Sequence, residues 1–247
     1  IGLALAIAIA AKIFEILAGA RAMDRHALKA PLDQNLPVLF ALAGVWNVNF
    51  QKIPTLAVLP YTDRLVRFPA FLQQLEMESN GKRVQRDGSP VRCETAPVIW
   101  GEPGNNAQHS FFQMLHQGQL LAALDLILIK RSPVGDAEAA TLALANGLAQ
   151  LETFTVGQGG DAHRVHPGSR AASVIALDEL TPETLGALIA LYEHKVYAQS
   201  VIWGINAFDQ FGVELGKKIC HATLGALQAT SSAELVSVRE RLAGLRG

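Results

Sequence analysis

The chain has 247 residues, of which 50% are hydrophobic and 17% are charged, and its net charge is −1 with the histidines neutral. This length can form one large or two small domains, and the composition excludes an intrinsically disordered chain. The nearly balanced charge argues against a nucleic-acid-binding protein, which normally carries a clustered basic surplus.

The chain begins at Ile1, inside the apolar run IGLALAIAIAAKIF. This run has no basic region and no cleavage pattern, so it does not indicate a signal peptide. Lys12 and Glu15 limit it to about eleven apolar residues, fewer than the roughly 20 of a membrane-spanning helix, and we expect no membrane segment here. Because a helix that is apolar on all sides is buried, we expect a fragment that begins inside a helix of a longer protein.

Hydrophobic periodicity predicts helices and strands in alternation along the rest of the chain. Thr181 and Pro182 are typical of a helix N-cap and first position, and Pro69 predicts a kink or break. The run at 120–130 fits a strand, although its leucines and alanines also allow a helix. The predicted helices span 11–28, 36–50, 62–79, 105–118, 135–157, 181–205, 208–220 and 233–245, and the predicted strands span 55–62, 96–104, 120–130 and 172–180.

Strands separated by helices indicate an α/β fold with a mostly parallel sheet flanked by helices. In such sheets ligands bind at the carboxyl ends of the strands. The Gly-rich turn that follows the strand PVIW is therefore one candidate edge of a site.

The segment QQLEMESNGKRV, residues 73–84, changes from an amphipathic helix to five small or polar residues. In a helix Gln74 and Glu78 are four residues apart and share a face. Such a face can be merely solvated, and SNG is a sequence that any helix C-cap could show. The segment alone therefore leaves a helix stop and a chemical role open.

The segment GEPGNNAQHSFFQMLHQG holds Glu102 before a Pro-Gly turn, where the amides of the next helix could hold an anion. His109 lies early in that predicted helix and His116 lies seven residues later on the same face. They would be about 10 Å apart, too far to share a metal ion. A single histidine on a helix is more often a packed or solvated residue.

The segment FGVELGKK lacks the spacing and the Ser or Thr of a phosphate-binding loop. It predicts a helix with Gln210 and Lys217 on one face, although an exposed lysine is the simpler interpretation. The chain shows no dinucleotide-binding fingerprint and no nucleophile elbow. Cys93 and Cys220 are too few for a disulfide scaffold and fit a reducing, cytoplasmic compartment.

Together these segments supply a carboxylate, an imidazole, an ammonium group and two amides, without a metal or cofactor motif. This set suits proton transfer on a small polar molecule.

Three segments resemble hallmark segments of the glucose-6-phosphate isomerase (phosphoglucose isomerase) family: MESNGK at 77–82, WGEPGNNAQH at 100–109 and FDQFGVELGKK at 208–218. Longer stretches, including NLPVLFALAGVWNVNF and LGALIALYEHKVYAQSVIWGIN, extend the resemblance over most of the chain. It implies the C-terminal half of a protein with two sugar-isomerase (SIS) α/β domains. The implied parts are a helical lead-in at 1–49, the second SIS-type domain at 50–201 and a C-terminal helical extension at 202–247, with the first SIS domain missing.

The resemblance also implies a cytoplasmic homodimer that interconverts glucose 6-phosphate and fructose 6-phosphate through a cis-enediolate, without metal or cofactor. Glu78 matches the family's general base, which carries a proton between C1 and C2. His109 matches a histidine that reaches the site from the neighbouring subunit and helps to open the sugar ring. Lys217 matches a lysine at the ring oxygen, and Gln74 and Gln210 match residues that line the substrate pocket.

The chain also departs from the family pattern. Asn105 and Ala107 stand where Thr and Gly are usual, and HPGSRAA replaces the usual EGNRPT. The family's phosphate-binding Ser and Thr residues and its enediolate-stabilising arginine have no match here, so we expect little activity from the isolated chain. The alternatives are a non-catalytic SIS-type sugar-phosphate binding or regulatory module, and a bifunctional enzyme with a fused transaldolase.

Overall fold

The computed structural model describes residues 12–132, 135, 137–228 and 240. The apolar run at 1–11 lies outside the described residues, as does the helix predicted over 233–245 apart from Glu240. The chain divides into two compact units, one that ends at Phe208 and one that begins at Asp209. Within the described part of the second unit, α9 (Phe211–Gln228) is the helix predicted from residue 208 onward.

The first unit is built on a parallel sheet, as the alternation of strands and helices predicted. Its strands are β1 (Thr55–Pro60), β2 (Val98–Trp100), β3 (Ala123–Arg131) and β4 (Ala172–Glu179), in the order β2-β1-β3-β4. β3 is a strand and not a helix because it pairs on both sides, with β1 and with β4. A strand with two parallel neighbours is buried on both faces, which explains its almost continuous apolar sequence.

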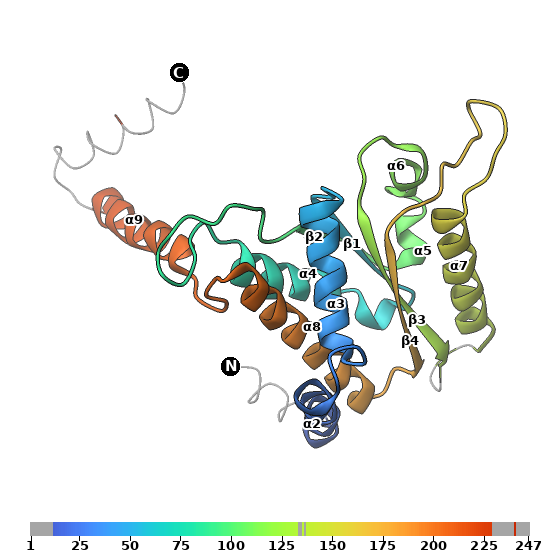
Figure 1. Ribbon diagram of the computed structural model, residues 1–247, viewed down its shortest axis with the longest axis horizontal. Helices are drawn as coiled ribbons and strands as arrows, with labels where there is room; N and C mark the ends of the chain where they lie inside the picture. The colour runs from blue at the N-terminus through green and yellow to red at the C-terminus, as the bar shows by residue number, and fades with distance from the viewer. Residues whose placement is uncertain (1–11, 133–134, 136, 229–239, 241–247) are drawn as a thin grey trace. The chain divides into compact units, whose positions relative to one another are not determined.

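Helices cover both faces of this sheet (Figure 1). Because side chains alternate along a strand, Leu56 and Val58 pack on one face, and Ala57 and Leu59 pack on the other. The first face meets α4 and α8, and the second meets α5, α6 and α7. The bounds of the helices in the first unit are α2 Ile13–Lys29, α3 Leu36–Val45, α4 Phe68–Leu72, α5 Gly104–Ala107, α6 Phe112–Gln117, α7 Ala137–Thr155 and α8 Pro182–Trp203.

The long helix α8 begins as its sequence predicts. The Thr181 hydroxyl accepts a hydrogen bond from the Thr184 amide, and the Thr184 hydroxyl accepts one from the Thr181 amide. This reciprocal cap, with Pro182 at the first position, satisfies amides that the helix itself leaves free. The helix ends at Gly204, whose φ of 68° is a backbone conformation that favours glycine.

The helix predicted over 62–79 is divided into three pieces. A 3₁₀ turn, η2 (Asp63–Leu65), comes first, and α4 starts afresh at Phe68 with Pro69 in its second position. This break confirms the effect predicted for the proline, which is tolerated only in the first turn of a helix. After α4 the chain widens into a π-helical turn, η3 (Gln73–Glu78), which the sequence did not predict.

Candidate active site

Glu78 is the last residue of the π-helical turn η3. Such turns are rare and frequently occur at functional sites. The Glu78 side chain is half-buried, and within the described part of the chain no side chain bonds to its carboxylate. Its backbone carbonyl accepts a hydrogen bond from the Lys82 ammonium, with an Nζ–O distance of 2.9 Å. The fold thus presents a carboxylate whose oxygens are available to a ligand.

The residues around Glu78 are tied to two other elements. The side-chain amide of Gln73 donates to the Ile99 carbonyl of β2 at 3.0 Å. The backbone amide of Ile99 donates to Met77 Sδ at 3.4 Å. On the other side, the side-chain amide of Asn80 donates to the Val196 carbonyl of α8 at 3.0 Å. The small and polar residues SNG are therefore more than a helix end, because buried Asn80 anchors the chain just after Glu78.

Gln74 lies on the same turn as Glu78, four residues earlier, and its side chain is exposed. The structure thus keeps these two predicted site residues on one short segment. A neutral amide in that place can donate and accept hydrogen bonds to a polar ligand.

The turn after β2 approaches the sheet closely. A Cβ on Gly101 would lie 2.1 Å from the Val58 carbonyl oxygen, and its φ is 139°, so only glycine fits there. The helix α5 that follows has four residues, and the Asn106 and Ala107 amides already donate to the Pro103 carbonyl. The Ser110 hydroxyl donates to the Glu102 carboxylate. Two of the amides at this helix start are therefore used internally and a carboxylate lies nearby, and the anion site that the sequence suggested stays a prediction.

His109 lies in an exposed turn between α5 and α6. The single helix predicted over 105–118, with His109 and His116 on one face, is therefore wrong. The chain breaks because Ala107 and Phe112 are both buried against the sheet, and the residues between them leave the helix.

His116 is a packed residue and belongs to the core side of α6. Its ring stacks on Phe154 with centroids 4.2 Å apart and contacts Gln150 Oε1 at 2.8 Å. Burial lowers the pKa of this histidine. The more common interpretation of a single helical histidine, as a packed side chain, is confirmed for His116.

Gln210 and Lys217 belong to the second unit and are both exposed. Lys217 lies within α9, but Gln210 comes one residue before its first residue, Phe211. The Gln210 carbonyl accepts a hydrogen bond from the Val213 amide at 3.0 Å, as residues at the start of a helix do, and the shared face of the two side chains stays a prediction.

Sequence reasoning missed a buried charged cluster directly beneath the Glu78 segment. Glu76 and Lys195 form an ion pair with an Nζ–Oε2 distance of 2.8 Å, and each is 1% exposed. Asp125 in β3 accepts a hydrogen bond from the Tyr192 hydroxyl at 3.0 Å. Burial raises the pKa of Asp125 to about 6, against the lowering effects of Lys195 and Tyr192. The sequence held one sign of this cluster: Asp125 is a single carboxylate inside the apolar run ALDLILI, which a buried strand would place in the core.

Among the described residues, no group of three or more His, Cys, Asp or Glu side chains is placed to hold a metal ion. Likewise, none of the described helices is long and apolar enough to cross a membrane. Cys93 and Cys220 are both free and exposed.

Comparison with known proteins identifies the family. A sequence model of the phosphoglucose isomerase family matches residues 1–238. The chain is 52% identical over 250 residues to a glucose-6-phosphate isomerase of Stenotrophomonas maltophilia K279a, covering 100% of this chain and 50% of the relative. It is 46% identical over 257 residues to the enzyme of that name from Chlorobium luteolum, covering 95% of this chain and 46% of the relative.

A solved structure agrees with the sequence matches. The crystal structure of a glucose-6-phosphate isomerase from Chlamydia trachomatis superposes with a TM-score of 0.84 at 38% identity, covering 92% of this chain and 46% of that one. The chain thus spans about half the length of the curated relatives it matches. Because the family model matches nearly all of its residues and relatives share about half of its sequence, this chain belongs to the phosphoglucose isomerase family.

Proposed function

We propose that the protein containing this chain interconverts glucose 6-phosphate and fructose 6-phosphate, and that this chain supplies the general base, Glu78. The observation that carries the proposal is the family match over residues 1–238, which includes a half-buried carboxylate without a bonding partner among the described residues. The relatives named glucose-6-phosphate isomerase support the substrate pair.

In the proposed reaction the Glu78 carboxylate removes the proton from C2 of the open-chain aldose. The electron pair of that C–H bond forms the cis-enediolate, whose negative charge lies on O1. As O2 loses its proton and O1 gains one, the proton held by Glu78 returns to C1 and gives the ketose. In the reverse direction the proton moves from C1 to C2. Bound substrate must shield this carboxylate from water during the transfer, which the half-buried position of Glu78 allows.

The other predicted site residues take supporting roles in this proposal. His109 helps to open the sugar ring, Lys217 acts at the ring oxygen, and Gln74 and Gln210 line the substrate pocket. Each step moves a proton between substrate and a side chain, so the proposal gives no role to a metal or cofactor. The exposure of His109, Lys217 and both glutamines suits residues that meet substrate or a second subunit.

The proposal extends to a cytoplasmic homodimer in which the rest of the protein holds the substrate phosphate. It keeps the domain boundaries at residues 49 and 201 as a prediction. Remote binding of a non-reacting phosphate typically positions the reacting carbons, so the isolated chain should turn over substrate at least about 10²-fold more slowly.

The test is Glu78→Gln in the full-length protein, with Glu94→Gln as matched control, because Glu94 is an exposed carboxylate whose described ion pair is with Lys52. Loss of a general base should lower kcat by about 10² to 10⁴-fold, while the control should keep its kcat. Deuterium exchange from solvent into C2 of glucose 6-phosphate should fall in parallel.

Two results would contradict the proposal. If Glu78→Gln retains wild-type turnover, another group is the base. If the full-length protein binds sugar phosphate but shows neither turnover nor deuterium exchange, it is a non-catalytic SIS-type binding module.

A further inference from the structure

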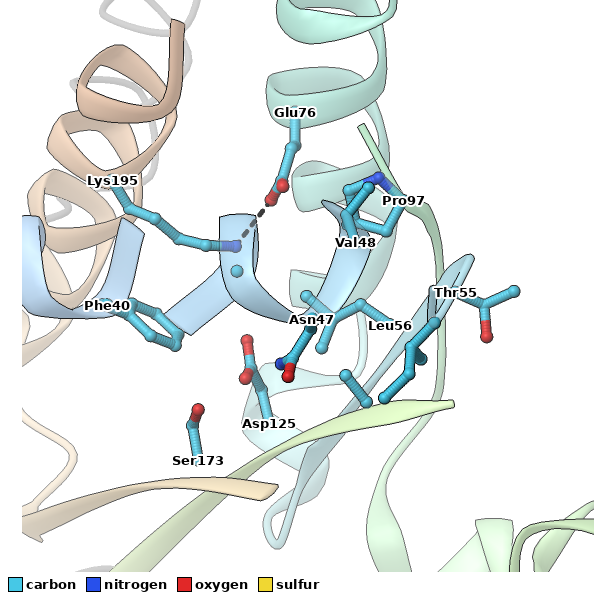
Figure 2. A pocket seen from close by; sticks show the side chains of 13 residues that line it. Phe40, Asn47, Val48, Thr55, Leu56, Glu76, Pro97, Asp125, Ser173 and Lys195 are labelled. Carbon is cyan, nitrogen blue, oxygen red and sulfur yellow. Dashed lines mark hydrogen bonds and ion pairs between the residues drawn. The ribbon is translucent and has the colours of Figure 1, made fainter. Parts of the chain in front are cut away.

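The charged cluster beneath Glu78 has no part in the proposed proton transfer. Figure 2 shows the side chains of Glu76 and Lys195 pointing toward one another, with Asp125 on the sheet below them. The cavity they line has a volume of about 20 Å³. That is room for about one water molecule, so the cluster is not a second substrate site.

Stability alone is a weak reason for this ion pair. Removing two charges from water costs several kcal/mol each, and well-packed apolar side chains of similar volume are often as stable or more so. Lys195 Nζ also lies over the rings of Phe40 and Tyr192, at 5.0 and 5.4 Å from their centroids. These contacts confine the ammonium group to one place, and through it they confine the Glu76 carboxylate.

Two buried contacts to α8 hold the chain on both sides of Glu78, one from Glu76 and one from Asn80. Glu76 lies two residues before Glu78 and Asn80 lies two residues after it. Their partners, the Lys195 ammonium and the Val196 carbonyl, belong to consecutive residues of α8. The segment is therefore attached to a single point of α8 on both sides of the proposed base.

The attachment also determines which way Glu78 points. Side chains two residues apart on a helical turn project to nearly opposite sides. Glu76 is 1% exposed against α8, and Glu78 is half-buried with a carboxylate that no described side chain bonds. Holding Glu76 inward thus holds Glu78 outward, toward the place where a ligand can reach it.

We propose that Lys195 is a positioning residue for proton transfer: through its ion pair with Glu76 it sets the position of the Glu78 carboxylate. The inference rests on the proposed isomerase function. Proton transfer requires near-attack geometry, and a misplacement of about 1 Å can cost about 10²-fold in rate. Lys195 and Asn80 together supply the rigidity that such geometry needs.

The experiment replaces both charges in the full-length protein with apolar side chains of similar length, Glu76→Leu with Lys195→Met. The double variant removes both charges of the ion pair, and without the lowering effect of Lys195 the buried Asp125 carboxyl should stay protonated. The variant should therefore fold with nearly unchanged thermal stability. Its kcat should fall by roughly 10 to 100-fold with little change in KM, since the ion pair between Glu76 and Lys195 does not touch substrate. Deuterium exchange at C2 of the sugar should slow by the same factor.

Two further variants separate positioning from general packing. Glu76→Gln keeps an oxygen that accepts the Lys195 hydrogen bond, so its kcat should stay within about threefold of wild type. The matched control is Thr184→Val, which removes the hydrogen bonds of the reciprocal cap at the start of the same helix, away from the Glu78 segment. It should lower stability and leave kcat unchanged.

The outcomes distinguish this inference from the function on which it rests. An active wild type with an equally fast double variant would overturn the positioning role alone. So would an equal loss of kcat in Thr184→Val, or, if the double variant fails to fold, a large loss of kcat in well-folded Glu76→Gln. A full-length wild type without isomerase activity would overturn the proposed function and this inference with it.

Discussion

The segment that carries Glu78 and the turn that carries His109 lie on either side of β2, but they are held very differently. Buried polar contacts to α8 and a part-buried contact to Ile99 of β2 hold the residues around Glu78. The turn at His109 is exposed, and the hydrogen bonds of His109 and Ser110 are local, from the His109 amide to Asn106 and from the Ser110 hydroxyl to Glu102. A part-buried long-range contact runs from the neighbouring Gln108 side chain to Asn146 of α7. Both regions belong to the first unit.

This difference bears on how the proposed site is assembled. A base that removes a proton from C2 and returns it to C1 needs a rigid support, and the contacts within its own domain provide one. A residue on an exposed turn is free to meet a second molecule. The comparison therefore fits the proposal that Glu78 serves its own subunit and His109 serves the site of the partner subunit.

The largest expected effect comes from mixing two inactive subunits of the full-length protein, His109→Ala and Glu78→Gln. If His109 serves the partner's site, each mixed dimer has one intact site, and a random mixture should reach about a quarter of wild-type activity. The measurement is a coupled assay for the isomerase reaction after subunit exchange. If both side chains serve the same subunit, no mixed dimer has an intact site, and activity would stay at the level of the separate variants.

The second prediction concerns the charges buried under the Glu78 segment. The folded state raises the pKa of Asp125 from 3.8 to about 6, so between these values the folded protein binds a proton that the unfolded chain has released. Its stabilising contribution is present below about pH 4 and is lost as pH rises through about 6, a change of about 3 kcal/mol in the free energy of unfolding.

This contribution is measured by comparing wild type with Asp125→Asn in denaturant titrations from pH 4 to 7. The wild type should lose stability relative to the variant as pH rises. Asp87→Asn is the contrasting control, because hydrogen bonds from Ser89 lower the pKa of the exposed Asp87 carboxyl, so its contribution is present across this pH range and is lost only at lower pH. Parallel pH profiles for wild type and Asp125→Asn would contradict the prediction.

The smallest expected effect compares two asparagines, one in each region. Asn80→Ala removes a buried hydrogen bond to the Val196 carbonyl and should lower the free energy of unfolding by about 1–3 kcal/mol. Asn106→Ala changes an exposed side chain beside His109 and should stay within about 0.5 kcal/mol of wild type. Thermal and denaturant unfolding measure both, and equal effects would mean that the two regions are equally anchored.

The sequence by itself determined much of the fold of the first unit. The four predicted strands, the break at Pro69 and the cap of α8 at Thr181 follow from alternation, ring geometry and hydrogen bonds between residues a few positions apart. The resemblance of MESNGK and its neighbours also predicted the family, which the match over residues 1–238 confirms. Such signals are local, so each segment carries them without its neighbours in space.

Only the tertiary structure decided how the candidate site is held. Glu76 and Lys195 are 119 residues apart in sequence, and their ion pair exists because the segment after β1 crosses α8 on one face of the sheet. The interruption of the helix at His109 likewise follows from the burial of Ala107 and Phe112 against β-strand side chains. Local sequence patterns cannot predict the ion pair or the helix break, because each depends on which side chain from a distant part of the sequence packs against it. Only the packing of the shared core brings those side chains together.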